Sequence, residues 1–186
     1  MPVVFKNVGR GRCLACSSHS QLIATDVVPT DVVRSAQRMD QFFEQEGQCL
    51  FCRTVQDELQ QQTRVVEDTA EFIAYCPFAS RLPALVTITS KKHLDRFEML
   101  TNDQLGQLSW LVHRIVRRIE HCYPEAAYNY VVHTATHGQQ SSPAMHWRLE
   151  LFPRISTVAG FEWGSECFIN PLPPEIAAHQ LRSASL

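Results

Sequence analysis

Residues 145–153, Met-His-Trp-Arg-Leu-Glu-Leu-Phe-Pro, constrain the fold most tightly because polar and apolar side chains alternate along them. Alternation with a period of two is typical of a β-strand whose two faces meet different surroundings. It divides the strand into an apolar face of Trp147, Leu149 and Leu151 and a polar face of His146, Arg148 and Glu150. The apolar face is expected to pack against a core. The polar face is either the outer side of a half-buried strand or part of a functional site.

A capping box at Thr101 and Gln104 predicts the start of the most regular helix of the chain. Its apolar stripe runs from Leu105 to Ile119, and Pro124 lies just beyond the expected end. Strands are predicted at 3–5, 22–25, 72–75, 85–88, 128–133, 145–152 and 158–163, and further helices at 30–47, 55–62 and 173–182. Strands interrupted by one long helix and shorter ones indicate an α+β fold, with helices packed against an antiparallel sheet.

The composition describes an ordinary globular protein of one domain or slightly more, with 186 residues, 45% hydrophobic and 19% charged. A formal net charge of -2 argues against a nucleic-acid partner. No apolar run approaches the roughly 20 residues of a membrane span, and the N-terminus lacks the apolar segment of a signal peptide. Seven cysteines in such a chain favour reduced thiols or a metal site over a disulfide framework. The expected compartment is the cytoplasm.

Cys49 and Cys52 form the clearest metal-binding pattern, Cys-Leu-Phe-Cys. A two-residue gap lets both thiolates bind one ion, and zinc then takes two further ligands, typically imidazoles. His93, which follows a predicted strand, and His146 complete the preferred set of four ligands. The competing interpretation is a buried pair of free thiols near unrelated histidines. Two other histidines are alternative ligands: His133 and His137.

A second candidate site is Ser-Ser-His-Ser-Gln at residues 17–21, after a glycine-bearing loop. The His19 imidazole could attack a phosphoryl group, while backbone N–H groups and the Gln21 amide stabilise the oxyanion. From composition alone the pattern is weak, because a histidine in a serine-rich turn is usually only solvated. Arg10 and Arg12 could instead make the loop a plain anion site.

Eight segments occur together in one known family: Val3-Val4-Phe5-Lys6-Asn7, His19-Ser20-Gln21-Leu22-Ile23-Ala24, Cys49-Leu50-Phe51-Cys52, residues 72–81, His133-Thr134-Ala135, His146-Trp147, residues 159–164 and Ile169-Asn170-Pro171. In this combination the chain resembles galactose-1-phosphate uridylyltransferases, which belong to the histidine-triad superfamily and contain two repeats. The resemblance covers nearly the whole chain. It implies a histidine-triad-like antiparallel sheet with packed helices.

The resemblance also implies a reaction in galactose metabolism. The family transfers UMP between glucose 1-phosphate and galactose 1-phosphate through a uridylylated histidine, so UDP-hexose and hexose 1-phosphate are the implied substrates. Its His-Pro-His-x-Gln motif falls on residues 17–21. His19 is then the nucleophile, and Gln21 donates a hydrogen bond to the phosphate. Imidazole suits this role because it attacks phosphorus while neutral and leaves readily again.

Three further residues gain roles from the same resemblance. Asn7 matches a nucleotide-contacting asparagine. Glu162 matches a carboxylate that recognises sugar hydroxyl groups across a dimer interface, so a homodimer is implied. Asn170, in the last matching segment, is assigned to substrate binding.

The chain departs from the family pattern at several positions. Ser17 stands where the family has a zinc-binding histidine, Leu14 where a phosphate-binding serine is expected, and Arg12 where a glycine is expected. Residues 1–47 are interpreted as the C-terminal part of a first histidine-triad-like repeat and residues 48–186 as a complete second repeat with the zinc site. Much of the nucleotide pocket has no counterpart, so we expect weak or no UMP transfer by this chain alone.

Two other functions compete with this enzyme hypothesis. The first is a non-catalytic, zinc-stabilised module that binds a nucleotide or a partner protein. The second is a compact nucleotide-hydrolysing protein that uses the second repeat, and Arg148 argues against it. Arg148 occupies the position of the central triad histidine, and a guanidinium stays protonated and cannot attack phosphorus. His146 is then best interpreted as a zinc ligand, and Glu150 as an ion-pair partner of Arg148.

Overall fold

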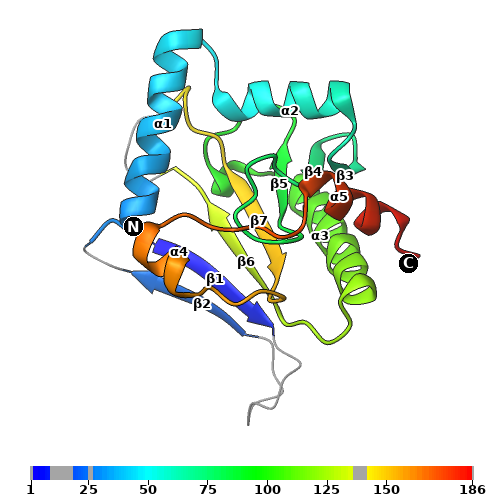
Figure 1. Ribbon diagram of the computed structural model, residues 1–186. Coiled ribbons are helices and arrows are strands. Elements are labelled where there is room, and N and C mark those ends of the chain that lie inside the picture. The colour runs from blue at the N-terminus through cyan, green and yellow to red at the C-terminus, as the bar shows by residue number, and fades with distance from the viewer. Residues whose placement is uncertain (1, 9–18, 25–26, 136–141, 186) are drawn as a thin grey trace.

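A computed structural model describes the backbone of residues 2–8 and 19–24 and all atoms of residues 27–135 and 142–185. Its elements, in chain order, are β1 (Pro2–Val8), β2 (His19–Ala24), α1 (Thr30–Glu46), α2 (Leu50–Gln61), β3 (Val65–Asp68), β4 (Phe72–Tyr75), β5 (Val86–Ser90), η1 (Phe97–Met99), α3 (Asn102–Cys122), β6 (Tyr128–His133), β7 (Arg148–Pro153), α4 (Gly160–Ser165) and α5 (Pro174–Ser183). The described strands form one seven-stranded sheet in the order β2-β1-β6-β7-β5-β4-β3 (Figure 1). Every neighbouring pair is antiparallel, which confirms the predicted α+β class.

One face of this sheet packs against α3 and α5 and forms the main core. Leu111, Ile115 and Ile119 of α3 are fully buried there. Trp147, Leu149 and Leu151 belong to the same cluster, so the predicted apolar face of the 145–153 stretch is confirmed. Burying side chains of this size is the main favourable term in folding, at about 1.5–3 kcal/mol for each one.

The opposite face of the sheet is covered in part by α2. Val55 of this helix packs against Val65, Ile73 and Tyr75 in a second buried cluster. α1 precedes α2 and contacts it, and Figure 1 shows the two helices above the sheet. The start of α2 therefore lies over the polar face of β7.

Local sequence signals set several of these boundaries. The capping box at Thr101 and Gln104 is present at the start of α3, as predicted. α1 ends at Gly47, which has the left-handed backbone (φ 67°) that glycine adopts without a steric penalty. α5 begins at Pro174, in agreement with the predicted proline in its first turn.

One predicted strand is a helix, the predicted starts of α2 and β7 are wrong, with β7 beginning at Arg148 and not at residue 145, and one strand is missing from the prediction. Residues 158–163 do not form a strand, because the chain turns into the short helix α4, whose first turn Glu162 stabilises by accepting a hydrogen bond from the Ala159 backbone N–H (3.0 Å). α2 begins at Leu50, not near Val55, with Cys49 as its extended N-cap residue. The missing strand is β3, whose four residues are too few to give a clear period.

Across the part of the chain that the structure describes, no helix combines the length and apolar character needed to cross a membrane.

Candidate functional site

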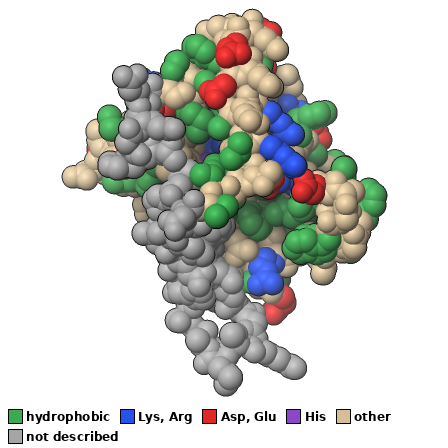
Figure 2. Space-filling view, turned by 90° about the vertical axis from the view of Figure 1, so that its left-hand side faces the viewer, with side chains coloured by type: hydrophobic (Ala, Val, Ile, Leu, Met, Phe, Trp, Pro, Cys, Tyr) green, Lys and Arg blue, Asp and Glu red, His purple; other side chains and the backbone are tan. Residues whose placement is uncertain are grey.

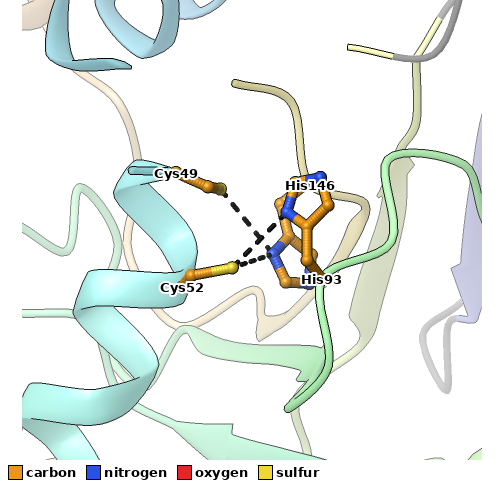
Figure 3. A group of neighbouring side chains, drawn as sticks. All are labelled: Cys49, Cys52, His93 and His146. Carbon is orange, nitrogen blue, oxygen red and sulfur yellow. Dashed lines mark hydrogen bonds between the residues drawn. The ribbon is translucent and has the colours of Figure 1, made fainter. Parts of the chain in front are cut away.

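Four potential metal ligands converge where α2 begins, as Figure 3 shows. Cys49 is the N-cap of α2 and Cys52 lies in its first turn, so the two thiols project from one helix end. His93 follows β5, and His146 directly precedes β7. One ligand atom from each residue lies within 4.8 Å of all the others. The structure therefore brings together the four residues that were predicted as ligands, although they lie as far as 97 positions apart in the sequence.

Three sulfur–nitrogen distances in this cluster are close to those around a tetrahedrally bound metal ion. Cys49 Sγ lies 3.8 Å from His146 Nδ1, and Cys52 Sγ lies 3.5 Å from the same nitrogen and 3.4 Å from His93 Nδ1. For comparison, with Zn–S bonds of about 2.3 Å and Zn–N bonds of about 2.0–2.1 Å the sulfur–nitrogen edge of a tetrahedron is about 3.6 Å. The four side chains are thus close enough together to hold one metal ion.

The buried environment of His146 leaves its Nδ1 atom available for a ligand. The ring is almost fully buried, and its Nε2 atom lies 3.0 Å from the hydroxyl of Ser90, which is also buried. Metal-bound histidines usually donate their second ring N–H to such a partner, which fixes the tautomer. His93 is exposed, so one side of the cluster lies at the surface.

The two thiols also behave as a coupled pair. The hydrogen bond between them lowers the pKa of Cys49 well below that of a free thiol, with a further contribution from His146. The same bond raises the pKa of Cys52. Ionisation of one thiol thus opposes ionisation of the other. A divalent cation would displace the remaining thiol proton and allow both thiolates to form, which is the state that zinc requires.

Replacing Ser90 with alanine is expected to weaken zinc binding by roughly 10–100-fold, because the His146 ring loses the partner that orients it. Competition with a chromogenic chelator measures this change directly. Ser183→Ala, at the exposed end of α5, removes the same hydroxyl far from the cluster and is expected to leave the affinity unchanged. Equal zinc affinity in the two variants would show that Ser90 does not orient His146.

A second polar cluster, formed by residues of β6 and β7, lies beside the first. Arg148 Nε donates a hydrogen bond to Glu150 Oε1 (3.0 Å), as expected from the sequence, and its guanidinium lies over the Phe51 ring, 4.8 Å from the centroid. His133 Nε2 lies 3.2 Å from Glu150 Oε2. Burial alone would raise the pKa of the Glu150 carboxyl, but the hydrogen bond with His133 and the charge of Arg148 lower it to about 2.

This second cluster bears on the alternative metal ligands. His133 pairs with Glu150 and is not among the residues that surround the candidate metal position. His137 lies outside the described residues. Phe51 connects the two clusters, since its ring makes edge contacts with His146 and carries the Arg148 guanidinium. No sequence pattern indicates the roles of Ser90 and Phe51, because a serine and an aromatic residue at these positions also fit a plain core.

The candidate nucleophile segment lies on β2, the edge strand of the described sheet that is beyond β1 and β6 from β7. His19 is the first residue of β2 and pairs with Asn7 of β1, while Gln21 pairs with Phe5. Asn7 in turn pairs with Asn129 of β6. The strand register therefore brings the positions of the proposed nucleophile and the proposed nucleotide-contacting asparagine into one row.

The two remaining predicted substrate residues lie in the segment after β7. Glu162 caps α4, and hydrogen bonds from backbone N–H groups lower the pKa of its carboxyl. Asn170 donates its side-chain amide to the Ser80 carbonyl (3.1 Å) and accepts from the Leu172 N–H (3.0 Å). These bonds give Asn170 a role in holding this segment against the turn between β4 and β5.

The sequence of this chain matches one family of proteins and is similar to several enzymes of known activity. Residues 12–184 match the family described as "Domain of unknown function (DUF4921)". ADP-glucose phosphorylase of Arabidopsis thaliana is 33% identical over 186 residues, which cover 98% of this chain and 52% of that protein. Galactose-1-phosphate uridylyltransferase of Thermotoga maritima is 25% identical over 98% of this chain and 60% of its own length. The chain thus spans between half and three fifths of the length of these relatives.

Solved structures agree with the sequence comparison. The crystal structure of an ADP-glucose phosphorylase from Arabidopsis thaliana with bound ADP-glucose superposes with a TM-score of 0.86 at 32% identity, and covers 100% of this chain and 60% of that one. A zinc-bound histidine triad family protein from Mycobacterium smegmatis shares the fold, with a TM-score of 0.53 at 16% identity over 73% of this chain and 91% of its own. The predicted histidine-triad-like fold is therefore confirmed.

Proposed function

Because the chain belongs to the DUF4921 family and is a homologue of galactose-1-phosphate uridylyltransferase-like proteins, we propose that it transfers a nucleoside monophosphate from a sugar nucleotide through His19. The observation that carries the proposal is the register of β1 and β2, which pairs His19 with Asn7 within a chain that matches these enzymes along almost all its length. The activity of the relatives is a property of proteins longer than this chain.

The proposed reaction has two displacement steps at phosphorus. The neutral His19 imidazole attacks the α-phosphorus of the sugar nucleotide, a nitrogen–phosphorus bond forms, and the bond to the β-phosphate oxygen breaks. Hexose 1-phosphate leaves with that oxygen. The amide of Gln21 donates a hydrogen bond to the phosphoryl oxygen as charge develops there. A phosphate oxygen of the acceptor then attacks the same phosphorus and restores free His19.

Two acceptors fit this scheme. Galactose 1-phosphate, with UDP-glucose as the donor, is the pair that the uridylyltransferase resemblance supports. Inorganic phosphate, with ADP-glucose as the donor, is supported by the relative that is 33% identical and named ADP-glucose phosphorylase. Both routes share the nucleotidyl-histidine intermediate, so a test of that intermediate does not depend on the choice of acceptor.

The test is to incubate the chain with UDP-glucose or ADP-glucose labelled at the α-phosphate. We expect acid-labile label on the protein at a low level, because much of the nucleotide pocket has no counterpart in this chain, and we expect the label to leave when the correct acceptor is added. The donor that labels the chain identifies the nucleotide. Absence of label with both donors would contradict the proposal and favour the non-catalytic, zinc-stabilised binding module.

We further propose that the metal ion is zinc, bound by Cys49, Cys52, His93 and His146. Two thiolates and two imidazoles in tetrahedral spacing suit zinc better than magnesium or calcium, which prefer oxygen ligands. With all four positions filled by protein side chains, the ion would stabilise the fold and has no open position for a substrate. Free thiols at Cys49 and Cys52 also support a cytoplasmic location, where disulfides are rare.

A homodimer is the proposed assembly. Glu162 of α4 lies between Phe161 and Trp163, whose side chains are 58% and 75% exposed, and Ile169 is 65% exposed in the same segment. Figure 2 shows the side of the molecule on which α1 and α4 lie, with hydrophobic side chains on its surface. Large apolar side chains that are exposed in one segment are often covered by a partner.

Light scattering is expected to give twice the 21.2 kDa of one chain, and Trp163→Glu is expected to shift the mass toward one chain. A single-chain mass for the unmodified protein would contradict the dimer.

A further inference from the structure

Asn129 presents a buried hydrogen-bond acceptor to which no described residue donates. Its side-chain Oδ1 atom is shielded from solvent and has no hydrogen-bond partner in the part of the chain that the structure describes. Buried side-chain oxygens are satisfied in the large majority of cases, so an unpaired one calls for a specific explanation. The nearby Arg148–Glu150–His133 group does not supply it, because its ion pairs are with one another.

The position of Asn129 in the sheet gives that explanation. Asn129 pairs with Asn7 of β1, and Asn7 pairs with His19 of β2. Directly paired residues share a face of an antiparallel sheet, so the three positions form one row across three adjacent strands. Neighbouring strands lie about 4.8 Å apart, which places Asn129 about 10 Å from His19 along the row. A sugar nucleotide held at His19 extends over such a distance.

The other neighbour of Asn129 in the row cannot satisfy the oxygen. Asn129 pairs on its far side with Phe152 of β7, a hydrocarbon side chain without a donor. Phe152 therefore leaves the acceptor unsatisfied on the β7 side, while the row continues on the other side through the positions of Asn7 and His19.

We propose that Asn129 is a substrate-binding residue whose Oδ1 atom accepts a hydrogen bond from a hydroxyl group of the sugar nucleotide held at His19. This inference rests on the proposed nucleotidyl transfer and adds a specificity contact from β6, outside the segments that carry the family resemblance. Ribose and hexose both offer hydroxyl donors, and an amide oxygen accepts from either. The contact distinguishes substrates that carry the hydroxyl from those that lack it. A ligand without the hydroxyl leaves the buried Asn129 oxygen unpaired and therefore binds more weakly.

The test measures binding of UDP-glucose and ADP-glucose by calorimetry in a His19→Ala chain, where no covalent step can follow binding. Asn129→Ala in this background is expected to weaken binding of the preferred nucleotide about tenfold, the loss typical of one neutral hydrogen bond. Asn102→Ala removes an exposed amide at the start of α3 and is expected to bind as the parent does. Melting temperatures of all variants verify that they are folded.

Deoxy analogues separate a direct contact from a structural effect. The parent chain is expected to bind one monodeoxy analogue, of the ribose or of the glucose, about tenfold more weakly than the complete nucleotide. Asn129→Ala is expected to bind that analogue and the complete nucleotide equally, because the lost hydroxyl and the lost oxygen are the same contact. If every analogue gave the same affinity ratio in both chains, the inference would be overturned. Failure of both nucleotides to bind would also overturn it, whereas label on the unmodified chain would still support the proposed transfer.

Discussion

Replacing Cys49 with serine is expected to abolish stoichiometric metal binding and to lower the melting temperature by more than about 10 °C. Structural zinc contributes about 10–16 kcal/mol of binding free energy at pH 7, and each kcal/mol shifts the melting temperature of a chain of this size by about 2–4 °C. Cys49 is almost fully buried and starts α2, so losing the ion also loosens the helix that covers the polar face of β7. Metal analysis after purification, expected to give about one equivalent for the unmodified chain, and thermal melting followed by circular dichroism measure both effects.

The matched control is Cys167→Ser, which replaces an exposed free thiol outside the cluster. It is expected to retain one equivalent of zinc and the unmodified melting temperature. Treating the unmodified chain with a strong chelator should reproduce the melting temperature of Cys49→Ser, because both remove the same ion. If Cys49→Ser kept both its zinc and its melting temperature, the four-ligand site would be wrong.

The metal ligands could be predicted from the sequence, but the residue that orients one of them could not. The spacing of Cys49 and Cys52 predicted a metal site with His93 and His146 as the preferred further ligands, but it left His133 as an alternative. The structure places His146 beside the two cysteines, while His133 pairs with Glu150. Ser90 could not be inferred from the sequence because its role depends on the antiparallel neighbours of β5.

The elements that were predicted well carry strong local signals. α1 and α3 have a glycine stop and a capping box, and β6 was predicted with its observed bounds. α4 was mistaken for a strand because Phe161 and Trp163 favour strands, whereas the Glu162 carboxylate accepts from the Ala159 N–H and the backbone bonds of the turn form. Capping of the turn is a contact that the strand propensity of its neighbours does not reveal.

The sheet register also relates two hairpin-like strand pairs. Asn7 pairs with His19 in β1 and β2, and His133 pairs with Arg148 in β6 and β7. The two pairs lie in different rows, because Asn7 pairs with Asn129 and Asn129 pairs with Phe152. Arg148 already pairs with Glu150 and lies over the Phe51 ring, and a guanidinium cannot act as a nucleophile. The proposed nucleophilic chemistry is therefore placed on β2.

Replacing His19 with alanine is expected to abolish the nucleotidyl-protein intermediate and to reduce nucleotidyl transfer by at least about four orders of magnitude. Removing a nucleophile eliminates the covalent route, and losses of this size or larger are measured when catalytic nucleophiles are deleted in other enzymes. Gln21→Ala is expected to be slower by about two to three orders of magnitude, because it removes one hydrogen bond to the developing charge and leaves the nucleophile in place. Acid-labile label and initial rates with the preferred donor and acceptor measure both.

His179→Ala is the matched control, since it removes an exposed imidazole on α5, away from β2. It is expected to retain the label and the rate of the unmodified chain. Sugar-nucleotide affinity in His19→Ala is expected to change little, because the nucleophile acts mainly in the transition state and the ground-state contacts belong to other residues. Label that persists in His19→Ala would assign the chemistry to a different residue. A chain that binds the nucleotide, carries no label in any form and retains its zinc would instead be a sugar-nucleotide-binding module on the same fold.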